Sequence, residues 1–326
     1  MDAALEDYIE RFRSPGATPP PLPPIVLGPR ARLRASVRDA FPRPVYEVAV
    51  GRGYGGLRKA ARRNPGRGRL LPDFLLIGGA KCGTTSLYDW LSTHPKILPA
   101  SEKEVHFFDY NFFRGEDWYR SHFARSGDAI GCITGEGSVS YLSHRWAPAR
   151  AARVVPHAKL ILVLRNPVDR AYSQYQMSRW EGLETCESFE EAIAWEDERL
   201  RPELDRIERD PRYNSLEFGV WSYLARGRYA EHLERWLEHF PRRQFLFLRA
   251  EDMFADAYAT LERIAEFLGV PPHRPEQLSH LLDGGKYAPM LEETRERLTA
   301  YFRPHNERLQ ELTEIDFGWD GSSAGA

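Results

Sequence analysis

Residues 74–86 read Phe-Leu-Leu-Ile-Gly-Gly-Ala-Lys-Cys-Gly-Thr-Thr-Ser. The apolar run predicts a buried strand, the glycines predict a turn, and the residues from Thr84 predict the start of a helix. In such a turn the backbone N–H groups and the positive end of the helix dipole face the same point, where they can bind an anion. The segment therefore predicts a phosphate-binding loop.

The lysine of this loop has an unusual position for an ATPase. Gly78 and Gly83 have the spacing of a Walker A loop, in which a lysine directly follows the second glycine. Here Thr84 takes that place, and Lys81 lies inside the loop. We interpret the segment as a phosphate-binding loop that does not serve ATP hydrolysis.

The overall composition is that of a globular protein with one large α/β domain and an appendage, or with two small domains. The chain has 326 residues, and its net charge of -2 argues against a nucleic-acid-binding protein. Its three cysteines lack CxxC spacing, which argues against a disulfide framework and a zinc site. The sequence shows no membrane-spanning apolar run and no signal peptide, so we expect a cytoplasmic protein.

The first 72 residues differ from the rest. Residues 19–24 include a proline-rich run, and the charges from Arg30 to Arg69 are nearly all positive. Short helices are possible at residues 5–12 and 31–40. Two interpretations stay open: a solvated leader packed loosely on the domain, or a basic arm for an acidic membrane surface or a carrier protein. We expect the main domain over residues 73–320 and a flexible tail over residues 321–326.

Strand and helix patterns alternate from residue 73 onward. Apolar strands are predicted at residues 74–77, 160–164 and 245–248, and helices at residues 86–93, 168–179 and 257–268. This order predicts an α/β fold, a P-loop-like three-layer sandwich with a central parallel sheet flanked by helices. Ligands of such sheets bind beyond the carboxyl ends of the strands.

One segment does not fit this alternation. Residues 183–210 are acidic and helical in pattern, with an interruption expected near Pro202. We interpret them as a solvated excursion from the domain.

Arginines follow two of the predicted strands. Arg165 ends the second strand and is followed by a helix that carries Ser173, and Arg249 ends the third strand. A nucleotide hydrolase usually has a magnesium-binding carboxylate at such a strand end, whereas a guanidinium suits bidentate capture of a phosphate. The pattern favours a ligand with two separated phosphates and no metal. Alternatively, Arg165 forms a structural ion pair with Asp169.

Two further segments could take part in chemistry. Glu104 and His106 alternate with apolar residues, so an extended backbone would place both side chains on one side, where a carboxylate beside an imidazole suits general-base work. The alternative is a surface turn with incidental charges. Gly284-Gly285-Lys286-Tyr287 could close over a phosphate, or could simply be the loop before a helix at residues 291–301.

Taken in this order, these segments resemble the sulfotransferases that use 3′-phosphoadenosine 5′-phosphosulfate (PAPS), especially the heparan sulfate sulfotransferase group and its bacterial relatives. The resemblance covers residues 73–319 and includes the segments Lys103–Asp109, Leu164–Ser173, Arg228–Leu237 and Tyr301–Leu309. It implies PAPS as the sulfuryl donor, no metal, and an acceptor hydroxyl or amine on a small molecule or glycan.

The resemblance also implies roles for individual residues. Glu104 would be the base, with His106 orienting it, and Lys81 would neutralise the leaving phosphate. The implied donor-binding residues are Lys81, Cys82, Gly83, Thr84, Thr85, Ser86, Arg165, Ser173, Lys286 and Tyr287. The chain departs from the heparan enzymes at residues 136–139, which read Glu-Gly-Ser-Val instead of Glu-Lys-Thr-Pro.

Two other functions remain as alternatives. A P-loop kinase or NTPase would bind ATP and depend on magnesium. A non-catalytic protein could retain the nucleotide loop for binding alone. The acceptor and the oligomeric state are not readable from the sequence.

Overall fold

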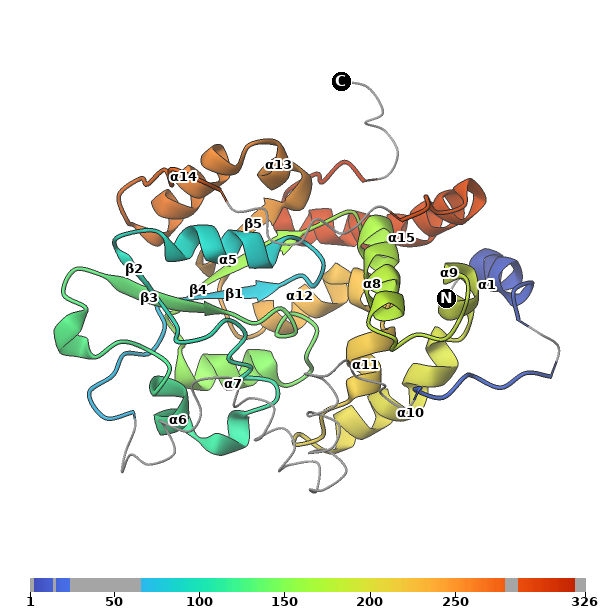
Figure 1. The fold of residues 1–326 in the computed structure, drawn as a ribbon, viewed down its shortest axis with the longest axis horizontal. Coiled ribbons are helices and arrows are strands. Elements are labelled where there is room, and N and C mark those ends of the chain that lie inside the picture. Colours follow the sequence, from blue (N-terminus) through green and yellow to red (C-terminus); the bar gives the residue numbers. More distant parts are fainter. Residues whose placement is uncertain (1–2, 14–15, 24–65, 279–286, 320–326) are drawn as a thin grey trace.

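The computed structural model describes residues 3–13, 16–23, 66–278 and 287–319. Its centre is a five-stranded sheet in the order β2-β3-β1-β4-β5, with every neighbouring pair parallel (Figure 1). The strands are β1 (Phe74–Gly78), β2 (Ile97–Pro99), β3 (Ile133–Gly137), β4 (Lys159–Leu164) and β5 (Phe245–Arg249). The chain moves from β1 to one side of the sheet and then returns to the other, so β1 lies at the switch point where such sheets bind ligands.

The helices of the described residues are α1 (Ala3–Glu10), α5 (Thr84–Ser92), α6 (Glu116–Arg120), α7 (Ala147–Val154), α8 (Pro167–Trp180), α9 (Phe189–Ala194), α10 (Glu196–Arg209), α11 (Leu216–Trp221), α12 (Tyr229–Leu237), α13 (Ala250–Ala255), α14 (Ala257–Leu268) and α15 (Glu292–Thr313). Of these, α1, α9, α10 and α11 lie together beside the sheet (Figure 1). No helix of the described residues is long and apolar enough to cross a membrane.

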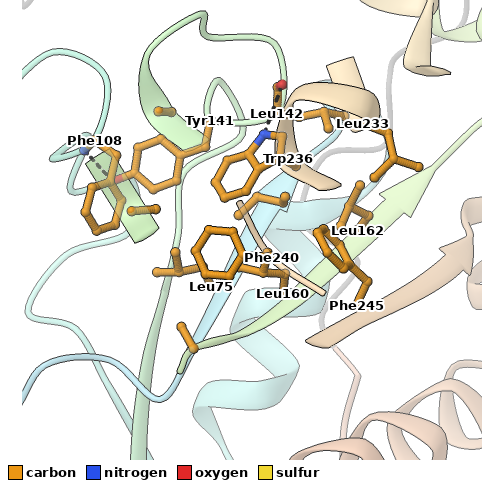
Figure 2. Close-up of a cluster of buried hydrophobic side chains, with 14 of the residues drawn as sticks. Leu75, Phe108, Tyr141, Leu142, Leu160, Leu162, Leu233, Trp236, Phe240 and Phe245 are labelled. Carbon is orange, nitrogen blue, oxygen red and sulfur yellow. Dashed lines mark hydrogen bonds between the residues drawn. The ribbon is translucent and has the colours of Figure 1, made fainter. Parts of the chain in front are cut away.

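Alternate residues of the strands face the two sides of the sheet. Leu75, Leu160 and Leu162 pack with residues of α7 and α12, and Figure 2 shows them beside Trp236 and Phe240. The residues between them, such as Leu76 and Ile161, pack with α5, α13 and α14 on the opposite face. Both faces are therefore buried, which confirms the predicted α/β sandwich with a flanked parallel sheet.

The N-terminal helix packs against the rest of the molecule. Leu5, Tyr8 and Ile9 of α1 are buried in a cluster formed mainly by α8 to α11 and α15. The Tyr8 hydroxyl also hydrogen-bonds to the Thr294 hydroxyl at 2.8 Å. Most of the basic run (residues 24–65) and the tail from residue 320 lie outside the described residues.

The acidic segment differs from its prediction. Glu184 and Arg199 form a buried ion pair at 2.7 Å, and Glu196 accepts hydrogen bonds from the backbone N–H groups of Leu224 and Ala225. Carboxylates become buried when such partners replace water, so the segment is part of the packed structure and not a solvated excursion.

The expected break at Pro202 is also absent, because α10 continues through it. Pro202 removes one helical hydrogen bond, but Pro202 and Glu198 are both exposed, so water can reach the carbonyl that is left unpaired. In addition, α15 extends to Thr313, twelve residues beyond the predicted end of that helix.

Candidate active site

The glycine loop connects β1 to α5. Lys81 and Gly83 have left-handed backbones, with φ of 68° and 84°. A Cβ atom at Gly83 would lie 2.5 Å from Met253 Cε and 2.6 Å from Phe254 Cζ, so another residue here would displace these side chains and strain the left-handed backbone. No side chain caps the N-terminus of α5. A helix start without a capping side chain favours binding of an anion by backbone N–H groups.

Lys81 and Arg165 meet across two neighbouring strand ends. The Arg165 guanidinium donates to the Lys81 carbonyl at 3.4 Å, and Lys81 Nζ lies 3.3 Å from Met177 Sδ. No described carboxylate lies within ion-pair distance of either cation. Burial lowers the pKa of Lys81, while the nearby Glu181 acts in the opposite direction. Two cations without ion-pair partners beside an uncapped helix end favour an anionic ligand.

Of the other loop residues, three are buried, and one makes a side-chain contact with a neighbouring segment. Cys82 is buried, and burial raises the pKa of its thiol to about 11, so it is a neutral core residue whose backbone alone is left for a ligand. Thr84 and Ser86 are also buried. The Thr85 hydroxyl accepts a hydrogen bond from Lys103 Nζ at 2.7 Å, which ties the loop to the segment after β2.

That segment joins three side chains in a row. His106 Nε2 lies 3.2 Å from Glu104 Oε2, and His106 Nδ1 lies 2.8 Å from Asp109 Oδ2. Lys103 Nζ also donates to Glu104 Oε1 at 3.1 Å. The predicted pairing of Glu104 with His106 is therefore present.

The backbone that produces this pairing is not the extended one that we predicted. Glu104 and His106 have φ of 60° and 53°, in the left-handed region. Their N–H groups donate to the Gly137 carbonyl at 3.0 Å and to the Ser138 hydroxyl at 3.1 Å. Contacts with the end of β3 therefore hold the turn, and alternation along a strand does not explain it.

The charges of the three side chains support one another. Although burial opposes both changes, hydrogen bonds and charge from His106 and Lys103 lower the pKa of Glu104 to about 2, and Asp109 and Glu104 raise the pKa of His106 to about 10. Asp109 is fully buried, and His106 lowers its pKa to about 2 against the effect of burial. At neutral pH an imidazolium therefore lies between two carboxylates.

The remaining predicted donor residues have different positions. Asp169 pairs with Arg295 at 2.8 Å and not with Arg165, so the structural ion pair that we considered is absent. Ser173 is buried on the second turn of α8. Tyr287 packs edge-on against Tyr172, the residue before Ser173, at 5.4 Å. Lys286 lies outside the described residues.

Arg249 offers no free cation at the sheet edge. Its guanidinium lies 3.4 Å from Glu251 and 3.7 Å from Asp252. This arginine already has carboxylate partners, unlike Arg165. No cluster of three or more His, Cys, Asp or Glu side chains in the described part of the chain is arranged to hold a metal ion.

A hollow lies beside the Glu104–Asp109 segment. Its lining includes Tyr110, Ser140, His144, Asn214, Phe218 and Arg226. Tyr110 stacks obliquely on the His106 ring, with centroids 4.9 Å apart. Tyr110 lines this hollow, whereas the aromatic residues Phe112, Trp118 and Tyr119, which follow it in the chain, pack in or against the core.

Sequence reasoning gave no role to several residues of this region. Asp109 and Lys103 lie inside the segment that we singled out, so a search for charged partners close to Glu104 could have found them. Ser140, which donates to Asp109, lies 31 residues away and gives no comparable local signal.

The family described as "Sulfotransferase domain" matches residues 71–303. The human heparan sulfate glucosamine 3-O-sulfotransferase 3A1 is 33% identical over 284 residues, covering 77% of this chain and 63% of that protein. The mouse 3-O-sulfotransferase 6 is 32% identical, covering 95% of this chain and 87% of that protein.

A further relative and a crystal structure are also similar to this chain. The chain spans only 30% of the mouse bifunctional heparan sulfate N-deacetylase/N-sulfotransferase 4, with 34% identity. A crystal structure of a sulfotransferase from Alicyclobacillus acidocaldarius has 33% identity and a TM-score of 0.61, covering 77% of this chain and 99% of that one. These matches confirm the resemblance that the sequence motifs predicted.

Proposed function

Because this chain belongs to the sulfotransferase domain family, we propose that it transfers a sulfuryl group from PAPS to a hydroxyl or amine of a small-molecule or glycan acceptor. One observation carries the proposal. Lys103 Nζ bridges the Thr85 hydroxyl of the glycine loop and the Glu104 carboxylate, at 2.7 and 3.1 Å. An anion on the loop would therefore lie next to an ionised carboxylate.

On the donor side, the glycine loop would bind the 5′-phosphosulfate. Sulfuryl transfer resembles phosphoryl transfer, in which positioning and electrostatics do most of the work. The backbone N–H groups at the start of α5 and the Lys81 ammonium would neutralise charge that builds on the leaving phosphate. Arg165 and Ser173 would hold the 3′-phosphate. Since ATP lacks that phosphate, this contact would select against it.

On the acceptor side, Glu104 would take the proton of the attacking hydroxyl or amine. With a pKa of about 2 it is always ionised near neutral pH, but it is a weak base. Proton transfer would therefore come late, after bond formation to sulfur has made the acceptor more acidic. His106, held by Asp109, would fix the direction of the carboxylate.

The test combines calorimetry with a turnover assay. We expect the protein to bind 3′-phosphoadenosine 5′-phosphate more tightly than ATP, with or without magnesium, and Arg165→Ala to weaken that binding by about tenfold or more. Arg274→Ala, an exposed arginine paired with Glu262, is the control. Tighter, magnesium-dependent ATP binding would instead favour a kinase or NTPase.

Turnover separates an enzyme from a binding protein. Cell extract is incubated with the protein and sulfur-labelled PAPS, and products are searched by mass spectrometry for the added mass of SO3. We expect a labelled product that disappears with Lys81→Ala, because this change removes the ammonium that would neutralise the leaving phosphate. Tight nucleotide binding with no labelled product from any extract would favour the non-catalytic alternative.

A further inference from the structure

Glu136 is a buried carboxylate in β3 without a cationic partner among the described residues. Its side chain is fully inaccessible to solvent. Oε1 accepts hydrogen bonds from the Tyr141 hydroxyl at 2.6 Å and the Tyr119 hydroxyl at 3.1 Å, and Oε2 accepts one from the Ser138 hydroxyl at 2.8 Å. Burying a carboxylate is costly, and these three hydrogen bonds offset part of that cost.

Two of these hydroxyls also hold the segment that carries Glu104 and His106. The Ser138 hydroxyl accepts from the His106 N–H at 3.1 Å, and the Tyr141 hydroxyl accepts from the N–H groups of Phe107 at 2.8 Å and Phe108 at 3.3 Å. Figure 2 shows the bond from Phe108 to Tyr141.

The direction of these bonds depends on Glu136. A hydroxyl has one proton, and each of these two hydroxyls gives it to the carboxylate. Its lone pairs are then free to accept from the backbone. Burial raises the pKa of Glu136 to about 7 against the effect of these hydrogen bonds, so the ionised form predominates above that pH. The ionised carboxylate accepts at both oxygens, whereas an amide accepts at only one, so glutamine at this position would leave one side of the network without an acceptor.

The segment needs this support because of its own geometry. Glu104 and His106 are not glycines, yet both have left-handed backbones. Residues of this kind seldom adopt such a conformation unless their surroundings impose it. The contacts named above come from residues 137–141, which follow Glu136 directly along the chain.

We propose that Glu136 is a positioning residue for catalysis: through the Ser138 and Tyr141 hydroxyls, its carboxylate holds Glu104 and His106 in place beside the glycine loop. The inference rests on the proposed sulfuryl transfer. Glu136 itself touches no reacting group in this arrangement, so its removal acts on geometry. None of these three hydrogen bonds of Glu136 goes to the glycine loop, which would therefore keep its shape.

The test compares Glu136→Gln with Thr134→Val. Thr134 is a buried residue of the same strand whose hydroxyl bonds to the Leu98 carbonyl at 2.6 Å, away from the segment. We expect Glu136→Gln to lower kcat by about tenfold to a hundredfold, with binding of 3′-phosphoadenosine 5′-phosphate unchanged within about twofold. We expect Thr134→Val to affect thermal stability and not kcat.

A second measurement does not depend on activity. In hydrogen-exchange mass spectrometry, Glu136→Gln should speed exchange of the amides of residues 104–108 and leave residues 79–87 as in the wild type. Thr134→Val should change neither. If wild-type protein transfers no sulfuryl group, the proposed function fails, while the exchange result still decides the structural part.

Two results would overturn the inference: wild-type kcat in Glu136→Gln, or parallel loss of kcat and nucleotide binding. If that variant does not fold, Tyr141→Phe replaces it, since it removes only the hydroxyl between Glu136 and the N–H groups of Phe107 and Phe108. Tyr141→Phe should then show the same selective loss of kcat and the same faster exchange. If Tyr141→Phe showed neither effect, the positioning role of Glu136 would be contradicted.

Discussion

The two halves of the candidate site are built in different ways. The glycine loop after β1 is made by the backbone: a left-handed glycine at residue 83 and the uncapped N-terminus of α5. The segment after β2 is made by side chains, in which Glu104, His106 and Asp109 form a chain supported from the end of β3. Both contain left-handed residues, but only one of them uses glycine there.

This difference predicts different responses to mutation. The shape of the glycine loop depends on local backbone conformation, so changes there should alter ligand binding first. The Glu104–Asp109 segment depends on hydrogen bonds to residues about 30 positions away, so changes there should alter the chemical step first. The largest effect is expected from a change of Glu104, the carboxylate on the acceptor side.

Glu104→Gln should separate the chemical step from binding. We expect kcat to fall by about 10²–10⁴-fold, because the amide cannot accept the proton. Binding of 3′-phosphoadenosine 5′-phosphate should remain close to wild type in calorimetry. Glu102→Gln, which removes a carboxylate paired with His122, is the matched control. A near-normal rate in Glu104→Gln would mean that another group is the base.

Gly83→Ala should show the opposite pattern. The new Cβ meets Met253 and Phe254, and the left-handed backbone adds a cost of about 1–2 kcal/mol. We expect nucleotide binding to weaken about tenfold or more, with a lower Tm. Gly269→Ala has a similar φ of 78° but open space around it, so it should share only the backbone cost. Equal nucleotide affinity in both variants would contradict the requirement for space at Gly83.

The smallest effect concerns pH and His106. Its folded-state pKa of about 10 exceeds the ordinary value of 6.5, so its stabilisation is complete below about pH 6.5 and is lost as pH rises towards 10. We expect wild type to lose about 1–2 kcal/mol more unfolding free energy than His106→Gln between pH 7 and 9. Urea unfolding at several pH values measures this difference.

The two carboxylates that flank His106 give no competing signal in that range. Glu104 and Asp109 have lowered pKa values of about 2, so their contribution is constant above about pH 5 and is lost only in acid. His144→Gln serves as the control, because burial lowers the pKa of His144 to about 4 and keeps it neutral. Parallel curves for wild type and His106→Gln would show that the imidazolium is not stabilised.

Sequence reasoning was most successful where structure is local. The strand, glycine turn and helix of residues 74–92 follow from neighbouring residues, and all are present. β3 was not predicted, because its sequence Ile-Thr-Gly-Glu-Gly lacks a strand-like apolar pattern and buries a glutamate. Burial of Glu184 and Glu196 was equally hidden, since their partners Arg199 and Leu224 come together only in the fold.

The site itself shows the same limit. Glu104 and His106 could be paired from their spacing, but their left-handed turn depends on Gly137 and Ser138. Arg165 could be placed at a strand end, but whether it had an ion-pair partner could not be read until Asp169 was found beside Arg295. Residue types and strand ends are visible in a sequence, whereas long-range hydrogen-bond partners are not.

The docking of α1 has a practical consequence for protein engineering. Its buried face of Leu5, Tyr8 and Ile9 covers apolar surface on α9 and α15. Of these two helices, α15 lies nearly 300 residues later in the chain. A shortened version that starts at the first strand would lay this surface bare and invite aggregation. Purification tags and truncations are therefore better designed around the first ten residues than through them.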